Sequence, residues 1–428
     1  QLNHPKALEC FSRALSFDHT PQTLIDLGIF LAERGRLQQA TEAFEQNEKR
    51  YGFAKNLYLV YADIFRKNKQ FHTACDLYKR VALQYPQLDN VLYNYGVSLY
   101  HLEKWTDSID VFERLISKKF MLNIVYRLLG NSYIASGNIE QGINNLTNAV
   151  KLSADNNDAL FDLAVVLQDT GASFDAITLY EKLAGDNTYR EKALTNRAVL
   201  FMKMGFVDDA MVEFTHLVEK NSHNMFVWDG LLLSFLYREK YPSAFRRRVY
   251  KRWYNLTKVT TNAQKKPPLL KKGKSKDKVR IGYVSPDFHY HPVASFIGPV
   301  LQNHNDAQFE IYCYANSTVR DDKEQWFESL GHRWTNICGL DNSAVYELIQ
   351  KNGIDILIDL SGHTAGNRLS LFHLKPSPVQ MTWLGYPDTT GLDTIDYRIT
   401  DSFCDPLSPS VWYAESLLTL SPCFLTYQ

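Results

Sequence analysis

Residues 157–190 of this 428-residue chain read NDALFDLAVVLQDTGASFDAITLYEKLAGDNTYR, and this stretch decides the first part of the fold. It holds an apolar residue followed by a small one, Leu163-Ala164, and a glycine, Gly171, seven residues after that small residue. Further on, the small Ala176 precedes the large Tyr180 by four residues. Small residues let two helices approach closely, and large ones fill the gap between neighbouring pairs. The stretch therefore predicts two helices joined by a turn at Gly171.

The same pattern recurs through the first 250 residues at a constant spacing of 34 positions. The small residue and the large one that follows it form this series: Ala40 and Phe44, Ala74 and Tyr78, Ser108 and Phe112, Gly142 and Leu146, Ala176 and Tyr180, Ala210 and Phe214. Turn glycines occupy one equivalent position in four units, at Gly35, Gly137, Gly171 and Gly205. Self-similarity at a fixed period indicates an array of stacked helical hairpins.

A period of 34 residues with this pattern resembles the tetratricopeptide repeat. We expect six clear repeats, which begin near Pro21, Lys55, Asp89, Asn123, Asn157 and Glu191. A seventh begins near Met225, with Trp228 and Ala244 in register, and a partial helix around Ala7 to Ala14 precedes the first. We therefore assign residues 1–258 to an all-α tetratricopeptide superhelix with a capping helix.

Arrays of this kind expose a long concave groove, which is lined mainly by the first helix of each repeat. Polar side chains share positions on that helix: Asp26, Asn94, Asp162 and Asn196 are equivalent, and Asn131 lies three residues further on in its own repeat. Amides and carboxylates in a row can hydrogen-bond the backbone of an extended peptide. Val60 and Leu128 interrupt the row. A peptide-binding groove and a solvated helix face are both open interpretations of this pattern.

The helical pattern ends at residues 260–278, which read TTNAQKKPPLLKKGKSKDK. Prolines, a glycine and many lysines break helix periodicity there. We interpret residues 259–277 as a basic, solvated linker, and a basic recognition patch is the alternative.

Beyond this linker, short apolar runs alternate with helical segments. The apolar runs at 279–284, 309–315, 354–360, 379–384 and 395–400 are expected strands, and 292–302, 322–331 and 343–352 are expected helices. Such alternation predicts a parallel sheet with helices on both faces. We assign residues 278–428 to this α/β, Rossmann-like lobe.

Four segments follow expected strands of this lobe. They are Ser285–Pro292, Gly362–Arg368, Gly385–Gly391 and Asp401-Ser402. Ligands of parallel sheets bind beyond the carboxyl ends of the strands, so these segments should open onto one edge of the sheet. Together they offer imidazoles, hydroxyls, a guanidinium and glycines that allow close backbone approach, and their shared placement predicts a cleft.

Three long motifs point to a known family. VRIGYVSPDFHYHPV (279–293), LIDLSGHTAGNR (357–368) and VQMTWLGYPDTTGLDTIDYRITD (379–401) resemble the N-terminal catalytic lobe of the O-GlcNAc transferase and SPINDLY family. GHTAGN and GYPDTTG bring the chain closer to SPINDLY-type and bacterial members. The repeat array in front of these motifs matches the usual layout of that family.

The resemblance implies a fold and an activity. The fold is GT-B, in which two Rossmann-like lobes face each other across the active site. Family members transfer N-acetylglucosamine from UDP, or fucose from GDP in the SPINDLY branch, to serine or threonine hydroxyls of proteins. The reaction inverts the anomeric carbon and needs no metal or other cofactor. The donor pyrophosphate is held mainly by the second lobe, partly at a helix N-terminus.

The chain stops at Gln428, where the family continues into its second lobe. We therefore expect a fragment of a longer protein, which would be inactive on its own. Family members often dimerise through their repeats, so a homodimer is a candidate assembly. Protein acceptors in the groove and a nucleotide sugar are the expected partners.

The resemblance also assigns candidate residues. His291 matches a family histidine close to the donor, which we interpret as a catalytic residue that orients the donor rather than as a true base; ordering of its own loop is the alternative. His363 and Thr364 lie next to the acceptor in the family layout, and Tyr386 and Pro387 border it. The alternatives for these four are a satisfied loop and a tight turn.

Three further residues carry weaker expectations. Asp287 and Asp401 each end a strand, where an aspartate either takes part in the chemistry or caps the next turn. Arg368 pairs with a phosphate or forms a surface ion pair. His289 and His291 are too few for a metal site, so no metal is predicted.

Composition excludes several classes of function. A formal net charge of zero argues against a nucleic-acid-binding protein. No apolar run is long enough for a membrane span, and no signal peptide is visible. The cysteines are sparse and form no C-x-x-C pair, which favours a reducing compartment, the cytoplasm or the nucleus. Two hypotheses remain: a protein O-glycosyltransferase, and a non-catalytic scaffold whose repeats recruit protein partners.

Overall fold

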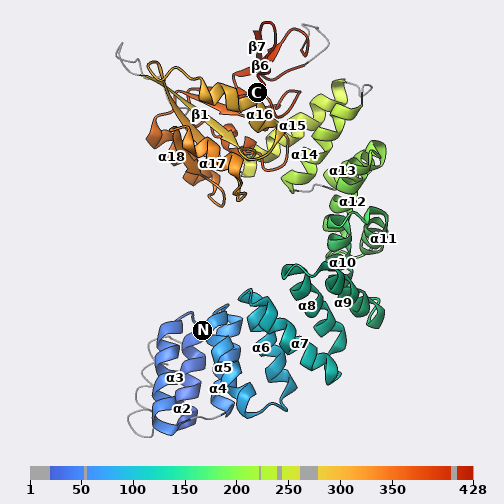
Figure 1. Cartoon of the computed structure of the whole chain (residues 1–428), viewed down its shortest axis with the longest axis vertical. Coiled ribbons are helices and arrows are strands. Elements are labelled where there is room, and N and C mark those ends of the chain that lie inside the picture. Colours follow the sequence, from blue (N-terminus) through green and yellow to red (C-terminus); the bar gives the residue numbers. More distant parts are fainter. Residues whose placement is uncertain are drawn as a thin grey trace. The chain divides into compact units, whose positions relative to one another are not determined.

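The computed structural model describes residues 20–52, 55–220, 223–238, 243–260, 278–405 and 412–427. The chain divides into two compact units, Gln1–Ala193 and Leu194–Gln428, and each is described here by itself. The partial helix expected around Ala7 and nearly all of the basic linker lie outside the described residues. Figure 1 follows the chain from the helices of the first unit to the α/β lobe of the second.

Every predicted repeat is a pair of helices. The helices of the first five repeats are α2 (Pro21–Ala32), α3 (Leu37–Tyr51), α4 (Lys55–Lys67), α5 (Phe71–Gln84), α6 (Asp89–His101), α7 (Trp105–Ser117), α8 (Leu122–Ala135), α9 (Ile139–Leu152), α10 (Asn157–Asp169) and α11 (Ser173–Leu183). The sixth consists of α12 (Arg190–Met204) and α13 (Val207–Glu219), and the seventh of α14 (Met225–Ser234), the 3-10 turn η1 (Phe235–Tyr237) and α15 (Ser243–Thr260). Observed repeat starts agree with the predicted ones to within one residue.

The small residues of the repeat pattern lie where paired helices come closest. In the fourth repeat, a Cβ atom built on Gly142 would lie 3.1 Å from the carbonyl oxygen of Gly130, and the reverse contact measures 3.0 Å. The large residue of each pair, such as Phe112 or Tyr180, is fully buried between neighbouring helices. Burial of one such side chain stabilises the fold by about 1.5–3 kcal/mol. The predicted packing of the array is confirmed.

The turn inside each repeat has a left-handed backbone even where glycine is absent. The predicted turn glycines have positive φ angles, for example +91° at Gly137. The equivalent positions in the second and third repeats are Lys69 and Glu103, with φ of +60° and +57°. The short connection between the two helices therefore demands this conformation, and glycine is only its easiest occupant.

The lobe contains one parallel seven-stranded sheet. Its strands are β1 (Val279–Ser285), β2 (Phe309–Ala315), β3 (Arg333–Asn336), β4 (Ile356–Asp359), β5 (Val379–Thr382), β6 (Tyr397–Asp401) and β7 (Ser416–Leu420). Their order across the sheet is β3-β2-β1-β4-β5-β6-β7, and all neighbouring pairs are parallel. This is the doubly wound order of Rossmann-like folds, with β7 added at one edge. The predicted fold class, helical repeats followed by an α/β lobe, is confirmed.

Helices cover both faces of this sheet. On one face, α16 (Pro292–Gln302) and α17 (Asp322–Ser329) join the core through residues such as Ile297 and Phe327, which pack with Ile281 and Cys313 of the strands. The opposite face carries Tyr314, whose hydroxyl accepts a hydrogen bond from Asn352 at the end of α18 (Asn342–Asn352). Both faces are thus buried, as the continuous apolar runs in the sequence predict.

The sequence did not predict β3, β7 or the short helix α19 (Leu369–His373). β3 and β7 form the two edges of the sheet, and their burial is incomplete. Short, half-exposed strands lack the apolar run that marks the central ones. Within the second unit, α15 also contacts α19, so the seventh repeat packs against the lobe (Figure 1).

Candidate functional site

The predicted loops meet at the edge where the strands end. β1 lies between β2 and β4, so the connections after β1 and β4 leave the sheet on opposite sides of a topological switch point. Ligands of doubly wound sheets bind in the crevice at such a point. The loop Gly362–Arg368 approaches the loop after β1 closely, because a Cβ atom on Gly366 would lie 2.9 Å from Cβ of Pro286. The structure therefore brings together two of the segments that the sequence predicts for the cleft.

His291 stands at the beginning of α16, in the loop after β1. It is the N-cap residue of that helix, and its Nδ1 accepts a hydrogen bond of 3.3 Å from the backbone N–H of Val293. An imidazole that accepts at Nδ1 carries its proton on Nε2 when it is neutral. The side chain is 39% exposed, so Nε2–H can donate to a ligand at this edge. This tautomer suits an orienting role and leaves no lone pair for a general base.

Asp287 lies beside His291, with 3.8 Å between Oδ2 and the Nδ1 of the histidine. Burial raises the pKa of the Asp287 carboxyl, and the nearby imidazoles of His291 and His289 oppose that shift. Asp401, at the end of β6, accepts hydrogen bonds from the backbone N–H groups of Phe403, Cys404 and Phe424. Asp401 therefore orders a turn, as the alternative interpretation expects.

His363 is only 1% exposed, and both nitrogens of its ring have partners. Nδ1 lies 2.9 Å from Oδ1 of Asp229 in α14, and Nε2 lies 2.8 Å from the carbonyl oxygen of Thr390. A carbonyl oxygen can only accept, so Nε2 carries a proton, and a second proton lies between Nδ1 and the carboxylate. No ring nitrogen is left for a substrate. The predicted acceptor contact of His363 remains a prediction, and its observed contacts join the last repeat to the lobe.

Other residues of this loop also have hydrogen-bond partners in the protein. The hydroxyl of Thr364 donates to the carbonyl of Ser361, and Asn367 donates to Oδ2 of Asp229 at 2.8 Å. Asp359, at the end of β4, accepts from the N–H groups of Ser361 and Gly362 and from the hydroxyl of Thr382. Burial raises the pKa of the Asp359 carboxyl to about 6. Hydrogen bonds therefore fix the conformation of this loop.

Arg368 is held by contacts within the lobe. Its guanidinium donates to the side chains of Asn316 and Asn342 and to the carbonyls of Ile337 and Leu340. Burial lowers the pKa of this group. Arg368 therefore ties the loop to its neighbours, and its contact with a phosphate remains a prediction.

Tyr386 and Pro387 lie in the loop after β5 and differ sharply in exposure. Tyr386 is 2% exposed, and its hydroxyl donates to the carbonyl of Leu232 in α14 and lies 2.9 Å from the hydroxyl of Tyr250 in α15. Burial raises the pKa of Tyr386 well above its usual range. Pro387 is exposed. Of these two residues, only Pro387 offers its side chain to a ligand, and substrate contact by either remains a prediction.

A cavity of about 440 Å³ adjoins this edge within the second unit. The lobe contributes His363, Ala365, Gly366, Asn367 and Ser370 to its wall. The repeats contribute Val199, Met202, Lys203, Phe214, Met225, Phe226, Asp229, Gly230 and Leu233. Concave, mostly apolar cavities of this size are the usual form of a ligand site.

Three of the predicted groove residues take part in hydrogen bonds between neighbouring repeats. Nδ2 of Asn94 donates to Oδ1 of Asp63 at 3.3 Å, and Nδ2 of Asn131 donates to Oδ2 of Asp162 at 2.8 Å. Arg127 adds a second donor to Asp162. Asp63 and Asn131 occupy equivalent positions, and so do Asn94 and Asp162. The same hydrogen bond between neighbouring repeats, here called the inter-repeat clasp, therefore occurs twice. In one clasp the aspartate belongs to the earlier repeat, and in the other it belongs to the later one. The polar row thus serves contacts between repeats, and its predicted peptide contacts are untested.

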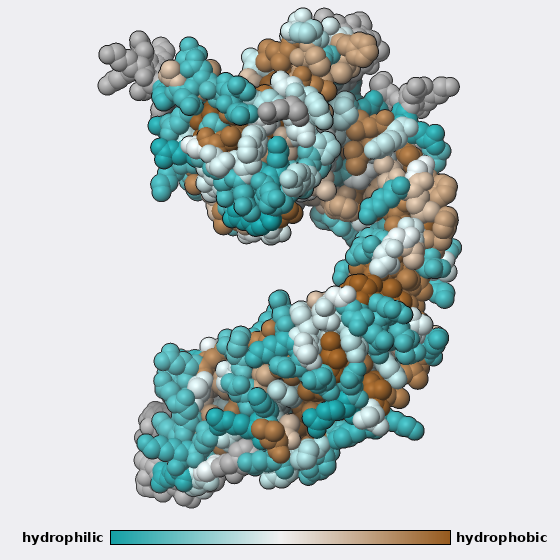
Figure 2. Space-filling model, in the orientation of Figure 1, coloured by the Kyte–Doolittle hydropathy of each residue, from teal (hydrophilic) through white to brown (hydrophobic). Residues whose placement is uncertain are grey.

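The remaining members of the row are not part of these clasps. Asp26 is exposed and accepts a hydrogen bond from Gln22 one turn earlier. Asn196 is half-buried in α12. Hydrophilic and hydrophobic side chains alternate over the repeats on the face drawn in Figure 2, without a continuous apolar stripe there.

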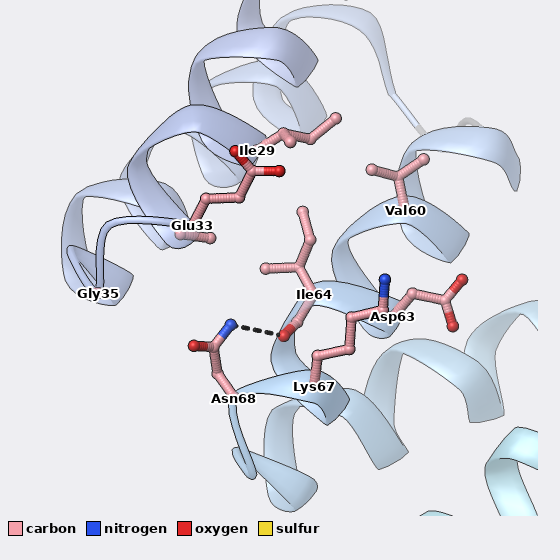
Figure 3. Close-up of a pocket in the computed structure, with 9 residues that line it drawn as sticks. Ile29, Glu33, Gly35, Val60, Asp63, Ile64, Lys67 and Asn68 are labelled. Carbon is pink, nitrogen blue, oxygen red and sulfur yellow. Dashed lines mark hydrogen bonds between the residues drawn. The ribbon is translucent and has the colours of Figure 1, made fainter. Parts of the chain in front are cut away.

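A pocket of about 470 Å³ opens on the predicted groove face of the first two repeats. Ile29, Val60 and Ile64 form its apolar part, and Glu33, Asp63 and Lys67 bring charge, as Figure 3 shows. Residues 60, 63 and 67 are equivalent to 26, 29 and 33 of the preceding repeat. The same helix positions that carry the polar row therefore line a cavity here.

Comparison with known proteins shows which family this arrangement resembles. A model described as glycosyl transferase family 41 matches residues 234–427, which include α15 and the α/β lobe. Over these residues the chain is similar to glycosyl transferase family 41. A tetratricopeptide repeat model matches residues 127–190, and one described as anaphase-promoting complex, cyclosome, subunit 3 matches residues 22–115.

Similar sequences include two plant proteins that bear the name "Probable UDP-N-acetylglucosamine--peptide N-acetylglucosaminyltransferase SPINDLY". The Arabidopsis thaliana protein is 41% identical over 153 residues, which is 35% of this chain and 17% of the relative. The Petunia hybrida protein is 44% identical over 160 residues, again 17% of its length. The match thus spans only a small part of these relatives.

A solved structure resembles this chain over a larger share of its length. This is a mutant of the Thermobaculum terrenum O-GlcNAc transferase, with a TM-score of 0.61 and 27% identity. The similarity covers 71% of this chain and 58% of that one. Both the helical repeats and the α/β lobe thus fit the fold of an O-GlcNAc transferase.

Sequence reasoning missed the residues that hold the seventh repeat to the lobe. Asp229, Arg246 and Tyr250 contact loop residues that lie more than 130 positions later: Asp229 contacts His363, and Arg246 and Tyr250 both contact Asp388. No spacing rule in the sequence links these residues to the lobe. A buried cluster of complementary charges is visible only once the fold is known.

Among the described residues, no group of three or more His, Cys, Asp or Glu side chains could hold a metal ion. In the same part of the chain, no helix combines the length and the apolar character that crossing a membrane requires.

Proposed function

We propose that this chain is the repeat-bearing, acceptor-side part of a protein O-glycosyltransferase. Such an enzyme moves a sugar from a nucleotide donor, UDP-N-acetylglucosamine or GDP-fucose, to a serine or threonine hydroxyl of a protein held by the repeats. The observation that carries the proposal is the edge of the sheet at the switch point between β1 and β4, where exposed His291 lies one loop away from the cavity shared with the last repeats. The names of the relatives support the donor UDP-N-acetylglucosamine.

In the proposed reaction the acceptor oxygen attacks the anomeric carbon, and the bond to the donor phosphate breaks with inversion. Negative charge grows on the leaving diphosphate. The Nε2–H of His291 is the group on this chain that we assign to that charge, because Nδ1 is used by the backbone of Val293. A preorganised donor of this kind contributes about 10²–10³-fold to rate. The proposal assigns the hydroxyl proton to no residue of this chain.

On the acceptor side, exposed Pro387 and half-buried Thr364 are the predicted residues whose side chains can touch a substrate. We assign His363 and Tyr386 a positioning role, since both are spent on contacts with α14 and α15. The proposal includes the division into a repeat array (1–258), a linker (259–277) and a catalytic lobe (278–428) and a cytoplasmic or nuclear setting. A homodimer through the repeats and a requirement for a second lobe belong to it as well.

A transfer assay tests this function. The protein as its gene encodes it is incubated with radiolabelled UDP-N-acetylglucosamine and GDP-fucose in parallel, together with a cell extract as a source of acceptors. We expect label in protein from one donor, and a roughly 10²-fold loss of rate for His291→Ala. The matched control is His289→Ala, two residues away, which should keep its activity. Absence of transfer from both donors would overturn the proposal.

The alternative is a non-catalytic scaffold. It is favoured by one observation: His363 and Tyr386, two of the predicted substrate-binding residues, are fully engaged in internal contacts. Retained binding of protein partners without any transfer would support the scaffold.

A further inference from the structure

We propose that the cavity between α12–α14 and the loop Gly362–Arg368 selects acceptor proteins by sequence. It takes one large apolar side chain, such as Phe, Met or Leu, with an acidic residue directly beside it. This inference rests on the proposed function, because it concerns the proteins that such an enzyme would accept.

Apolar side chains from three helices form one wall of the cavity. Met202 belongs to α12, Phe214 to α13, and Met225, Phe226 and Leu233 to α14. Phe226 is 47% exposed, although a large aromatic side chain gains most when it is covered. Two methionines give this wall an adaptable shape. A volume of about 440 Å³ leaves room for a whole large side chain and part of the backbone that carries it.

Asp229, the charged group at the polar end of the cavity, does not make binding of an apolar side chain costly. Asp229 is the carboxylate among the lining residues, and each of its oxygens has a partner: Oδ1 faces Nδ1 of His363, and Oδ2 accepts from Asn367. A carboxylate satisfied in this way needs no hydrogen bond from a ligand. An unpaired one would make burial of an apolar side chain beside it costly.

The positive charge of Lys203 determines which charge the bound acceptor segment should carry. It is exposed at the rim of the cavity, in the last turn of α12. An ammonium group at the rim attracts a carboxylate that neighbours the inserted side chain and repels a lysine or arginine there. The partner that fits the cavity is therefore an extended acidic-apolar segment.

The cavity is placed to act on acceptors. Ala365 and Gly366 are exposed and form the opposite wall, on the loop that leaves β4. The same loop touches Pro286 in the segment that leads to His291. A segment anchored by one side chain in the cavity thus continues along the strand-end edge of the sheet, where a hydroxyl a few residues away can reach the reacting region.

Fluorescence anisotropy with labelled peptides tests the pocket without any transfer reaction. The probes are three ten-residue, serine-containing peptides that share one sequence except for a central Phe-Glu, Ala-Glu or Phe-Lys pair. We expect the 428-residue chain to bind the Phe-Glu peptide about tenfold or more tightly than either of the others, which corresponds to burial of roughly one apolar side chain.

Two variants of the chain with matched controls give the decisive comparison. Lys203→Glu should reverse the preference, so that the Phe-Lys peptide binds more tightly than the Phe-Glu peptide. Phe226→Ala should reduce the difference between the Phe-Glu and Ala-Glu peptides severalfold. Lys220→Glu and Phe206→Ala make the same changes at exposed positions of the same unit that do not line the cavity, and should leave all preferences unchanged.

The outcomes separate this inference from the proposed function. Equal affinity for the three peptides, or a Lys203→Glu effect no different from that of Lys220→Glu, would overturn the pocket even if the enzyme transfers sugar. Clear discrimination between the peptides together with no transfer from either nucleotide sugar would overturn the proposed function and leave the pocket standing.

Discussion

The repeats of the first unit and the junction between the seventh repeat and the lobe are both held by contacts between helices and their surroundings, but at very different sequence separations. Between neighbouring repeats, Asn131 bonds Asp162 and Tyr61 bonds Leu24, which are 31 and 37 positions apart. At the junction, Asp229 bonds His363 and Arg246 bonds Asp388, across 134 and 142 positions. A periodic sequence predicts the contacts between neighbouring repeats, because they recur with the period. It does not predict the contacts between the seventh repeat and the lobe.

The two regions also differ in how their polar contacts meet water. Side chains of the inter-repeat clasps, such as Asp162 at 23% exposure, remain partly solvated. At the junction, His363 and Asp388 are 1% and 7% exposed. Partly solvated ion pairs contribute about 0–1 kcal/mol, whereas loss of one partner from a buried pair costs about 3–5 kcal/mol. Mutations should therefore weigh more heavily at the junction, and four experiments test this.

The largest effect is expected for His363→Ala. The change removes one of the two partners of half-buried Asp229, takes away the donor to the Thr390 carbonyl and opens a cavity, so unfolding should become easier by about 3–5 kcal/mol. Urea denaturation followed by tryptophan fluorescence measures it, because the ring of Trp253 lies 4.6 Å from that of His363. His216→Ala, at an exposed histidine of α13, is the control. A loss below 1 kcal/mol for His363→Ala would contradict the comparison.

Two glycines with the same backbone conformation separate strain from crowding. Gly391, at the junction, has φ of +74°, and a Cβ atom there would lie 2.7 Å from Cδ1 of fully buried Tyr250. Gly137, in a repeat turn, has φ of +91° and no atom within 4 Å of its Cβ position. Gly137→Ala should cost about 1–2 kcal/mol from strain alone, and Gly391→Ala about 3 kcal/mol or more. Circular dichroism melts of both variants provide the measurement, and equal losses would show that the junction is not tightly packed.

A third experiment uses pH. Burial raises the pKa of Asp359 to about 6 in the folded protein, against 3.8 for an unperturbed carboxyl. Between these values the folded state holds a proton that the unfolded state has released, so stability is highest at low pH and is lost as pH rises from about 4 to about 6. The loss is on the order of 2–3 kcal/mol. Asp359→Asn should remove this part of the pH dependence of urea midpoints, and an unchanged profile would contradict the assignment.

The smallest effect is expected in the repeats. Asn94→Ala breaks one clasp and should cost below about 1 kcal/mol. The double exchange Asp63→Asn with Asn94→Asp recreates the arrangement seen at Asn131 and Asp162, and should recover most of that loss. Thermal denaturation of the two variants and the parent measures both effects. Failure of the exchange to recover stability would mean that the two clasps are not equivalent.

The sequence therefore predicted the array more fully than the site. The 34-residue spacing located every repeat from Pro21 to Met225 and identified which small residues face a neighbouring helix, because those contacts repeat with the sequence. Apolar runs located five of the seven strands, and the parallel order followed from their alternation with helices. The half-exposed edge strands β3 and β7 carry no such run.

For the site, the strand-end position of each loop was predictable, and the use of each side chain was not. His291 and His363 both follow strands and look alike in sequence. The first is an exposed helix cap, and the second is sealed between Asp229 and the Thr390 carbonyl. The difference arises from α14, whose docking on the lobe has no local sequence signal.

The left-handed turns at Lys69 and Glu103 have a consequence for engineering. A non-glycine residue held in that conformation costs about 1–2 kcal/mol, and four sister repeats avoid the cost with glycine. Replacing Lys69 and Glu103 by glycine should therefore raise the melting temperature of the second and third repeats. Both positions lie in turns outside the predicted groove.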